Sequence, residues 1–209
     1  EQVRNRRGQH AEQRHQDDGR QENSLGRGDH HARDQIEHLR ELKIPVVVVQ
    51  SSNFKEIESS IELVAQAMGS EKQGFQLIRR FRGELQKIEQ RAAERAKAGK
   101  PRARVLLQLD SNPLVVAGRS TFLNEALEKI GAINVYGDTA IAYPRPSLED
   151  AIRRDPDAIV VLGMSKNMSL SEKTAQSWQQ FNRMKAVKTG KVKAMAGETI
   201  TRPTPRIIE

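Results

Sequence analysis

The side chains best suited to bind a ligand stand in segments that follow the predicted strands of this chain. These segments span residues 110–118, 137–146, 163–168 and 196–205. In an open α/β sheet, ligands bind beyond the carboxyl ends of the strands, where these segments are expected to meet. They offer an apolar surface, one aromatic ring and one acid–base pair, which suits a large, partly apolar ligand with polar edges. The side chains concerned are Leu114, Val115, Val116, Tyr143, Glu198 and Arg202.

The sequence lacks the residue patterns on which common catalytic and nucleotide sites depend. It contains no GxxxxGK(S/T) or GxGxxG phosphate-binding pattern, no HExxH zinc pattern and no GxSxG nucleophile pattern. It has no cysteine, and its last histidine is His38, so the region that follows has neither a thiol nucleophile nor an imidazole base. Glu149 and Asp150 are adjacent on a predicted helix and therefore point in different directions. We expect a binding protein and not an enzyme, with no catalytic residue, no metal site and no cofactor.

Two predicted helix starts carry groups that could bind a charged partner. The amides of residues 118–120 precede a helix and could hold an anion, although an ordinary helix start is the favoured reading. Glu149 stands in the first turn of a helix that Ser147 is expected to cap, where the helix dipole stabilises a carboxylate. From the residues alone, that stabilisation is sufficient reason for a glutamate at this position.

A long helix precedes these segments in the chain. The pattern predicts it over residues 70–99, with a capping box formed by Ser70 and Gln73 and a stop at Gly99. Its roughly 28 residues would span roughly 42 Å, which is more than most single domains need. We therefore expect it to connect two lobes. Its predicted apolar stripe consists of Ile78, Phe81, Leu85, Ile88 and Ala92.

Strands and helices alternate along most of the chain. Continuous runs of apolar, β-branched residues predict buried strands, and amphipathic segments between them predict helices. This alternation predicts an α/β fold, a Rossmann-like three-layer lobe with a parallel sheet, preceded by the long helix. The predicted strands span residues 44–50, 104–109, 133–136, 158–162 and 192–195, and the shorter predicted helices span residues 36–42, 54–68, 122–130, 148–154 and 171–182.

Composition narrows the class of protein and of partner. The 209 residues carry a formal net charge of +8, but the basic side chains are interleaved with acidic ones on predicted helices. Aromatic residues make up only 4% of the chain, so nucleic-acid binding is the weaker interpretation. No apolar run is long enough to cross a membrane, and no signal peptide is visible. Residues 1–33 have no apolar periodicity, and we expect them to be disordered or not of native sequence.

Several stretches of the chain, taken in order, resemble one family of binding proteins. They are ARDQIEHLRELKIPVVVV, the long helix, RVLLQLDSNPLVVAGRSTFLNEALEKIGAINVYGD, YPRPSLEDAIRRDPDAIVVLG, MKAVKTGKVKAM and GETITRPTPRIIE. From about residue 32 onward, the chain resembles the carboxyl-terminal part of the helical-backbone substrate-binding proteins of bacterial ABC importers. The members of that family bind cobalamin, ferric siderophores or haem.

The resemblance implies a domain organisation. Residues 34–69 would be a remnant of a first lobe, residues 70–99 the backbone helix between lobes, and residues 102–209 the second, ligand-binding lobe. The rest of the first lobe would belong where residues 1–33 stand, and the last helix of the family would begin where the chain ends at Glu209. We therefore expect a truncated or frame-disrupted member that binds its ligand poorly, since half of the cleft would be absent.

The resemblance also implies roles for single residues. Val115 and Tyr143 occupy positions at which the cobalamin binder has aromatic ligand contacts. Glu198 and Arg202 match an acidic and a basic residue near the ligand. Glu149 matches a surface glutamate that meets arginines on the membrane permease.

Partners and location follow from the same resemblance. It implies an ABC importer permease as protein partner, cobalamin, ferric siderophore or haem as ligand, no nucleic acid, and a periplasmic or other extracytoplasmic location. The protein would meet the membrane only through the permease. Two other interpretations stay open, a truncated inactive fragment and a small flavodoxin-like interaction domain. A signal peptide and a first lobe encoded upstream would favour the importer interpretation over both.

Overall fold

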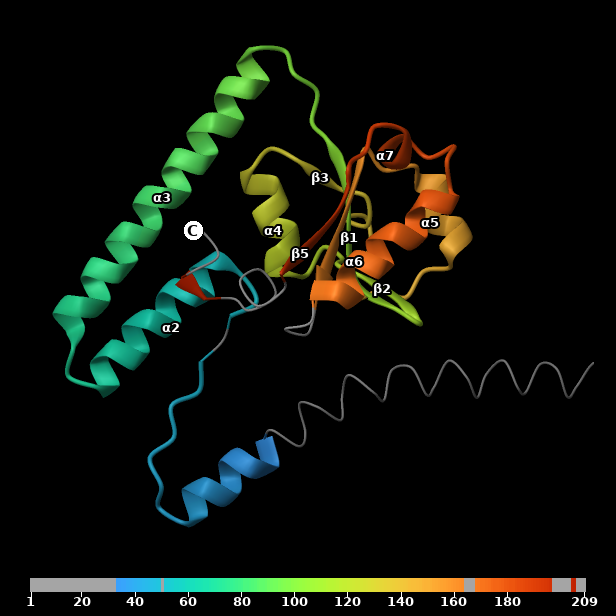
Figure 1. Cartoon of the computed structure of the whole chain (residues 1–209). Coiled ribbons are helices and arrows are strands. Elements are labelled where there is room, and N and C mark those ends of the chain that lie inside the picture. The colour runs from blue at the N-terminus through green and yellow to red at the C-terminus, as the bar shows by residue number, and fades with distance from the viewer. Residues whose placement is uncertain (1–32, 50, 164–167, 197–203, 206–209) are drawn as a thin grey trace, which may run out of the picture. The chain divides into compact units, whose positions relative to one another are not determined.

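The computed structural model of the chain describes residues 33–49, 51–163, 168–196 and 204–205 (Figure 1). The chain divides into two units, Glu1–Val48 and Val49–Glu209. The sequence predicts that residues 1–33 are disordered or not of native sequence, but all of these residues except Arg33 lie outside the described part of the chain. The same holds for Glu198 and Arg202.

In the first unit, a short helix is followed by an extended segment that is not a strand. Residues 33–41 are helical, as the apolar spacing predicted. The prediction of a buried strand over residues 44–50 is wrong for the part that is described, because residues 44–49 form no strand and the side chains of Ile44 and Val47 are 46% and 47% exposed. A β-branched run becomes a buried strand only beside a strand that accepts its hydrogen bonds, and the described residues of the first unit form no such strand.

A mixed sheet forms the centre of the second unit. Among the described residues, its strands lie in the order β2-β1-β4-β5, and β3 also pairs with β1. β1 runs parallel to β3 and to β4, and β4 runs parallel to β5, which confirms the prediction of parallel strands. β2 is antiparallel to β1 and lies where we expected only a loop. The strands are β1 (Arg104–Ser111), β2 (Leu114–Val116), β3 (Ile133–Asn134), β4 (Ala158–Gly163) and β5 (Val192–Ala196).

Helices cover both faces of this sheet, so the second unit has three layers (Figure 1). Successive side chains of a strand point to opposite faces. Leu106 of β1 therefore belongs to a core with α5, α6 and α7, while Val105 and Leu107 belong to a core with α4. The helices of the second unit are α2 (Phe54–Ala67), α3 (Glu71–Lys97), α4 (Phe122–Lys129), α5 (Leu148–Arg154), α6 (Met168–Ser177) and α7 (Lys185–Lys188), and the 3₁₀ turn η1 (Trp178–Gln180) follows α6.

The long helix α3 packs against α2 and has the predicted stripe. Phe81 and Leu85 are buried, and the other stripe residues are half-buried. Its 27 residues span about 40 Å at about 1.5 Å per residue. The predicted capping box is wrong, because Ser70 makes no side-chain cap and its hydroxyl instead donates to the carbonyl of Ala65. That hydrogen bond closes the turn between α2 and α3.

Other predicted helix starts are confirmed. The Asn53 side chain accepts a hydrogen bond from the Glu56 amide at 2.9 Å, which begins α2. The Ser147 hydroxyl accepts from the Asp150 amide at 3.2 Å, which begins α5. Each cap satisfies an amide that the helix itself leaves without an acceptor.

The turn before α4 depends on a close backbone approach. The amide of Gly118 donates to the carbonyl of Ala142 at 2.8 Å, and the amide of Val116 donates to the carbonyl of Pro144 at 3.1 Å. A Cβ atom on Gly118 would stand 1.9 Å from the carbonyl oxygen of Ile141. The segment of residues 141–144 therefore lies against residues 116–118 only because residue 118 has no side chain.

A charged cluster ties α5 to the turn after β3. Arg154 donates to Asp138 and Asp150 at 2.9 Å and 3.0 Å, and its guanidinium lies 4.3 Å from the centre of the Tyr136 ring. The Tyr136 hydroxyl donates to Asp150 at 3.0 Å. Burial is the main cause that raises the pKa of Tyr136, and the hydrogen bond to Asp150 adds to it, so this hydroxyl is a donor at any physiological pH.

Gly118→Ala is expected to lower the free energy of unfolding by about 2 kcal/mol or more, because the added methyl group overlaps a backbone oxygen. Gly83→Ala is the matched control, since a Cβ on Gly83 in α3 meets nothing within 4 Å. That control should gain about 0.5–1 kcal/mol from the better helix propensity of alanine. Urea denaturation of the three proteins measures both changes. Equal stability of Gly118→Ala and the parent protein would show that the 141–144 segment does not lie as described.

Asp150→Asn is expected to make the stability of the protein less dependent on pH in the acid range. Burial raises the pKa of Asp150, but hydrogen bonds from Arg154, Tyr136 and Arg153 outweigh it and hold the pKa below its ordinary value. The carboxylate therefore contributes stability above its unfolded pKa of about 3.9, and this contribution is lost as the pH falls through the lower folded pKa.

Thermal unfolding between about pH 2 and pH 5 measures this dependence. The slope of stability against pH should be shallower in Asp150→Asn than in the parent protein. Tyr136→Phe, which removes one donor, should lie between them. Parallel curves for all three proteins would contradict the assigned role of Asp150.

Candidate functional site

The candidate site lies at the carboxyl edge of the parallel strands. β1, β4 and β5 run in the same direction, so their ends at Ser111, Gly163 and Ala196 lie at one edge of the sheet. The β1–β2 hairpin turns at this edge. Three of the segments predicted to bind a ligand begin here, as expected for an open α/β sheet. The fourth, residues 137–146, follows β3, which pairs with the start of β1.

Two of the predicted ligand residues lie on neighbouring segments. Val115 is half-buried on β2, and Tyr143 is 44% exposed in the loop before α5. The hydrogen bond from the Val116 amide to the Pro144 carbonyl joins these segments directly. The structure therefore brings the segments that carry Val115 and Tyr143, 28 positions apart in sequence, side by side.

The expected apolar shelf is narrower than the sequence suggested. Val116 is fully buried in the core and is not available to a ligand, and the half-buried Leu114 packs against the same core. The reason is the period of a strand: residues 114 and 116 face the core together, which leaves Val115 on the opposite side. A loop was expected here, and a loop imposes no such alternation.

Ile141 adds apolar surface that the sequence analysis did not select. Its side chain is 55% exposed, and it lies two residues before Tyr143 in the segment that pairs with residues 116–118. The sequence held no clear signal for it, because a single exposed isoleucine between two alanines is normal on a protein surface.

The turn at residues 118–120 is an ordinary helix start. The amides of Gly118 and Arg119 donate to the carbonyls of Ala142 and Thr139, at 2.8 Å and 3.2 Å, so these amides are not free for an anion. The Thr121 hydroxyl caps α4 by accepting from the Asn124 amide. The anion-binding alternative is therefore wrong for these two amides.

Glu149 is exposed in the first turn of α5, as predicted. A hydrogen bond from its own backbone amide, and a second one from the Ser147 hydroxyl, lower the pKa of its carboxyl. The side chain is therefore negatively charged at neutral pH and projects from a fixed helix start.

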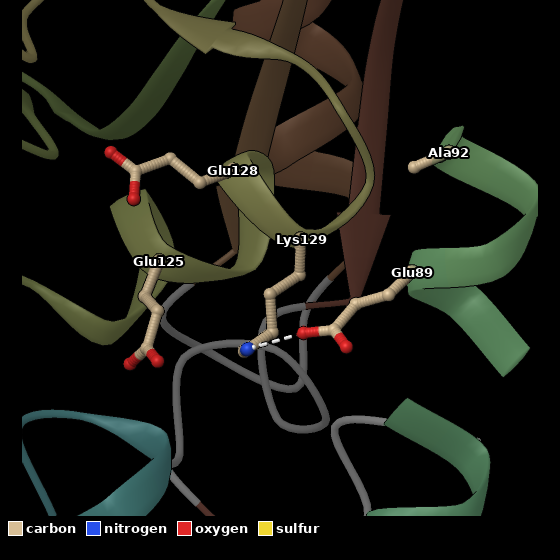
Figure 2. A pocket seen from close by; sticks show the side chains of 5 residues that line it. All are labelled: Glu89, Ala92, Glu125, Glu128 and Lys129. Carbon is tan, nitrogen blue, oxygen red and sulfur yellow. Dashed lines mark hydrogen bonds and ion pairs between the residues drawn. The ribbon is translucent and has the colours of Figure 1, made fainter. Parts of the chain in front are cut away.

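A polar hollow of about 380 Å³ separates α3 from α4 (Figure 2). Figure 2 shows the Lys129 ammonium against the Glu89 carboxylate, and the two groups are 2.6 Å apart. Glu125 accepts from the Phe54 amide at 2.8 Å, and the Lys129 ammonium lies 5.6 Å from the centre of the Phe54 ring. All of its described lining residues belong to α3 and α4, so this hollow lies between two helices that pack together.

An apolar groove of about 410 Å³ opens between α2 and α3. Its lining includes Ile61 and Val64 of α2 and Leu77 of α3. Thr204 and Pro205, from the last of the segments predicted to bind a ligand, also line it, and Val115 and Tyr143 do not. In the described part of the chain, no group of histidine and acidic side chains is arranged to hold a metal ion. None of the described helices is both long and apolar enough to span a bilayer.

Comparison with known proteins gives a family and a set of relatives. The family model described as periplasmic binding protein matches residues 25–199. An uncharacterized ABC transporter substrate-binding lipoprotein of Bacillus subtilis is 29% identical over 178 residues, which are 84% of this chain and 54% of that protein. A vitamin B12-binding protein of Vibrio parahaemolyticus is 25% identical over 174 residues, which are 83% of this chain and 60% of that protein. The chain thus spans little more than half the length of these relatives.

Solved structures show the same fold. The periplasmic vitamin B12-binding protein of Vibrio cholerae superimposes with a TM-score of 0.68 at 23% identity, over 84% of this chain and 65% of that chain. A periplasmic haem-binding protein of Roseiflexus superimposes with a TM-score of 0.71 at 21% identity, over 84% of this chain and 66% of that chain. At these identities the likeness concerns the fold alone, including the long helix before an α/β lobe.

A match over 175 residues is more than a shared architecture, because it includes the long helix, three of the strand-end segments and the order in which they occur. By that match, this chain belongs to the periplasmic binding protein family.

Proposed function

We propose that this chain is the substrate-binding component, in part, of an ABC importer, and that it binds cobalamin, a ferric siderophore or haem. The observation that carries the proposal is the joined pair of segments at the carboxyl edge of the sheet, which presents Val115, Ile141 and Tyr143 in a member of a solute-binding family. The names of its relatives, among them vitamin B12-binding and haem-binding proteins, support this ligand class. The chain would bind and deliver its ligand without changing it.

The residues suit a broad, partly apolar ligand. Corrin and porphyrin rings have wide apolar faces and polar groups at the rim. Tyr143 would supply a flat apolar face, with Val115 beside it. The family resemblance assigns polar contacts to Glu198 and Arg202, where a guanidinium offers five donors to a carboxylate or amide.

The helix α3 would act as the rigid connection between this lobe and a second lobe. It is long and packs against α2 along one face, and the ion pair between Glu89 and Lys129 joins it to α4. The matched residues make up only 54% and 60% of two relatives of this chain. A ligand held only by the segments described here would be covered from one side.

The protein partner would be an ABC permease, and the site of action would lie outside the cytoplasmic membrane. Relatives are described as periplasmic proteins or as a lipoprotein, which supports this location. Glu149 would pair with an arginine of the permease, since it is exposed, charged and fixed on a helix start. A charge at the rim of an interface mainly raises the association rate and orients the partners.

Tyr143→Ala is expected to weaken ligand binding about threefold to tenfold, because it removes an aromatic face. Equilibrium dialysis of the 209-residue chain against cyanocobalamin, haemin and a ferric hydroxamate first identifies the ligand. We expect a dissociation constant weaker than about 1 µM, since burial from one side is incomplete. Phe75→Ala, which removes a 67% exposed aromatic side chain from α3, is the matched control and should bind as the parent protein does.

Two results would contradict this part of the proposal. Equal affinity of Tyr143→Ala and the parent protein would remove Tyr143 from the site. Failure of all three ligands to bind the parent chain at millimolar concentration would leave the inactive-fragment interpretation in place of an active binding protein.

Glu149→Arg is expected to slow association with the cognate permease about tenfold at low salt, because it replaces an attractive charge by a repulsive one. Glu149→Ala should slow it less. Surface plasmon resonance with the permease in nanodiscs measures the association rate at two salt concentrations, and the difference should shrink at high salt. Glu71→Arg makes the same charge change at another first helical turn, in α3, and is the matched control. If both arginine variants associate equally fast, Glu149 is only a helix-start carboxylate.

A further inference from the structure

We infer that Gln108 is the positioning residue of the ligand site: it fixes the β1–β2 hairpin, and through the hairpin the Tyr143 segment, against α6 and η1. The inference rests on the proposed function, which gives Val115 and Tyr143 their role. The side chains of Gln108, Ser111, Thr174 and Trp178 form what is called here the Gln108 junction.

The Gln108 amide makes hydrogen bonds in two directions. Its Oε1 accepts from the Trp178 indole Nε1 at 2.7 Å, and its Nε2 donates to the Asp110 carbonyl at 3.1 Å and to Ser111 Oγ at 3.3 Å. An indole N–H can only donate, so the amide oxygen must face Trp178 and the amide nitrogen must face the hairpin. One side chain therefore joins the start of the hairpin to η1.

The anchor at the other end is part of the core. Trp178 is 2% exposed, and its ring meets Phe181 edge-on, with ring centres 5.8 Å apart. A second link runs parallel to the first, because Ser111 Oγ lies 3.2 Å from Thr174 Oγ1 of α6. The hairpin is thus held at two points, to η1 through the buried Trp178 and to α6 through Thr174.

The hairpin needs such a hold because its ladder is irregular. Gln108 pairs with Val116 and Asp110 pairs with Val115, so the register shifts between residues 108 and 110. A bulge of this kind bends the strand and interrupts its hydrogen bonds. The Gln108 amide donates to the Asp110 carbonyl within the irregular stretch, and so sets where the strand resumes.

The position of the hairpin passes on to the Tyr143 segment. Val116, the partner of Gln108 in the ladder, donates its amide to the Pro144 carbonyl at 3.1 Å. A shift of the hairpin would therefore move both predicted ligand residues together. This chain of contacts runs from Trp178 through Gln108 and Val116 to the residue after Tyr143.

The amide side chain of Gln108 is buried, although a polar group is costly to bury unless it forms hydrogen bonds. Residues 105–108 are all buried, and the first three of them are apolar. Every buried side-chain polar atom of the described residues has a hydrogen-bond partner. An apolar residue at position 108 would break this rule, because it would leave the Trp178 indole N–H without an acceptor. A leucine would pack there, but it could not fix the bulge.

The test uses the 209-residue chain and variants that remove different parts of the junction. Gln108→Glu keeps an acceptor for Trp178 and loses both donors to the hairpin. Trp178→Phe keeps most of the ring and loses the indole N–H. Gln108→Leu removes all three hydrogen bonds. Gln179→Leu, at an exposed glutamine next to Trp178, is the matched control.

Hydrogen exchange by mass spectrometry measures how firmly the hairpin is held. In Gln108→Glu and Gln108→Leu, the amides of residues 109–118 should exchange about tenfold faster than in the parent protein, while those of α3 keep their rates. Trp178→Phe should show a smaller change of the same kind, and Gln179→Leu none. Unchanged exchange at residues 109–118, or equal acceleration there and in α3, would overturn the inference, since Gln108 would then be only a core residue.

Ligand titration separates this inference from the proposed function. If the parent chain binds cyanocobalamin, haemin or a ferric hydroxamate, the affinity of Gln108→Glu should fall about tenfold, and an unchanged affinity would overturn the positioning role. If the parent chain binds none of them, the proposed function fails, while the exchange measurement still decides whether Gln108 holds the hairpin.

Discussion

Hydrogen bonding of β1 along both of its edges is the constraint on which the second unit depends. β1 is parallel to β4 on one side, and on its other side it pairs with β3 near its start and with β2 near its end. Its side chains enter two separate cores, so helices must cover both faces of the sheet. The carboxyl end of β1 leads directly into the candidate site. The same strand thereby sets the layers, the register and the place of the hairpin.

Much of this fold could be predicted because the signals are local and redundant. The runs at residues 104–109 and 158–162 have apolar side chains on both faces, as central strands require, and both became central strands. Asn53 and Ser147 each cap a helix through contacts that reach only three residues along the chain. Helix α3 was predictable to within about two residues at each end, which is the usual uncertainty of helix boundaries.

Predictions failed where the outcome depends on a partner far away in sequence. Residues 44–49 have the composition of a buried strand, but composition cannot supply a neighbouring strand. Val115 and Val116 are identical in type, and only the pairing of β2 with β1 decides that Val116 is buried. Gln108 carries no motif, because its role arises from a bulge and from Trp178, 70 residues later. Tyr143 could be named from its position after a strand, but its partner segment is evident only from the backbone contacts of Gly118 and Val116.

Trp178 has a spectroscopic consequence. It is the single tryptophan of the chain, and its indole N–H is engaged by one acceptor in a buried setting. Emission excited at the red edge of the protein spectrum therefore originates from one ring, whose wavelength depends on the polarity and hydrogen bonding around it. The tryptophan fluorescence of this protein therefore reports, without an introduced label, on the contact between η1 and β1.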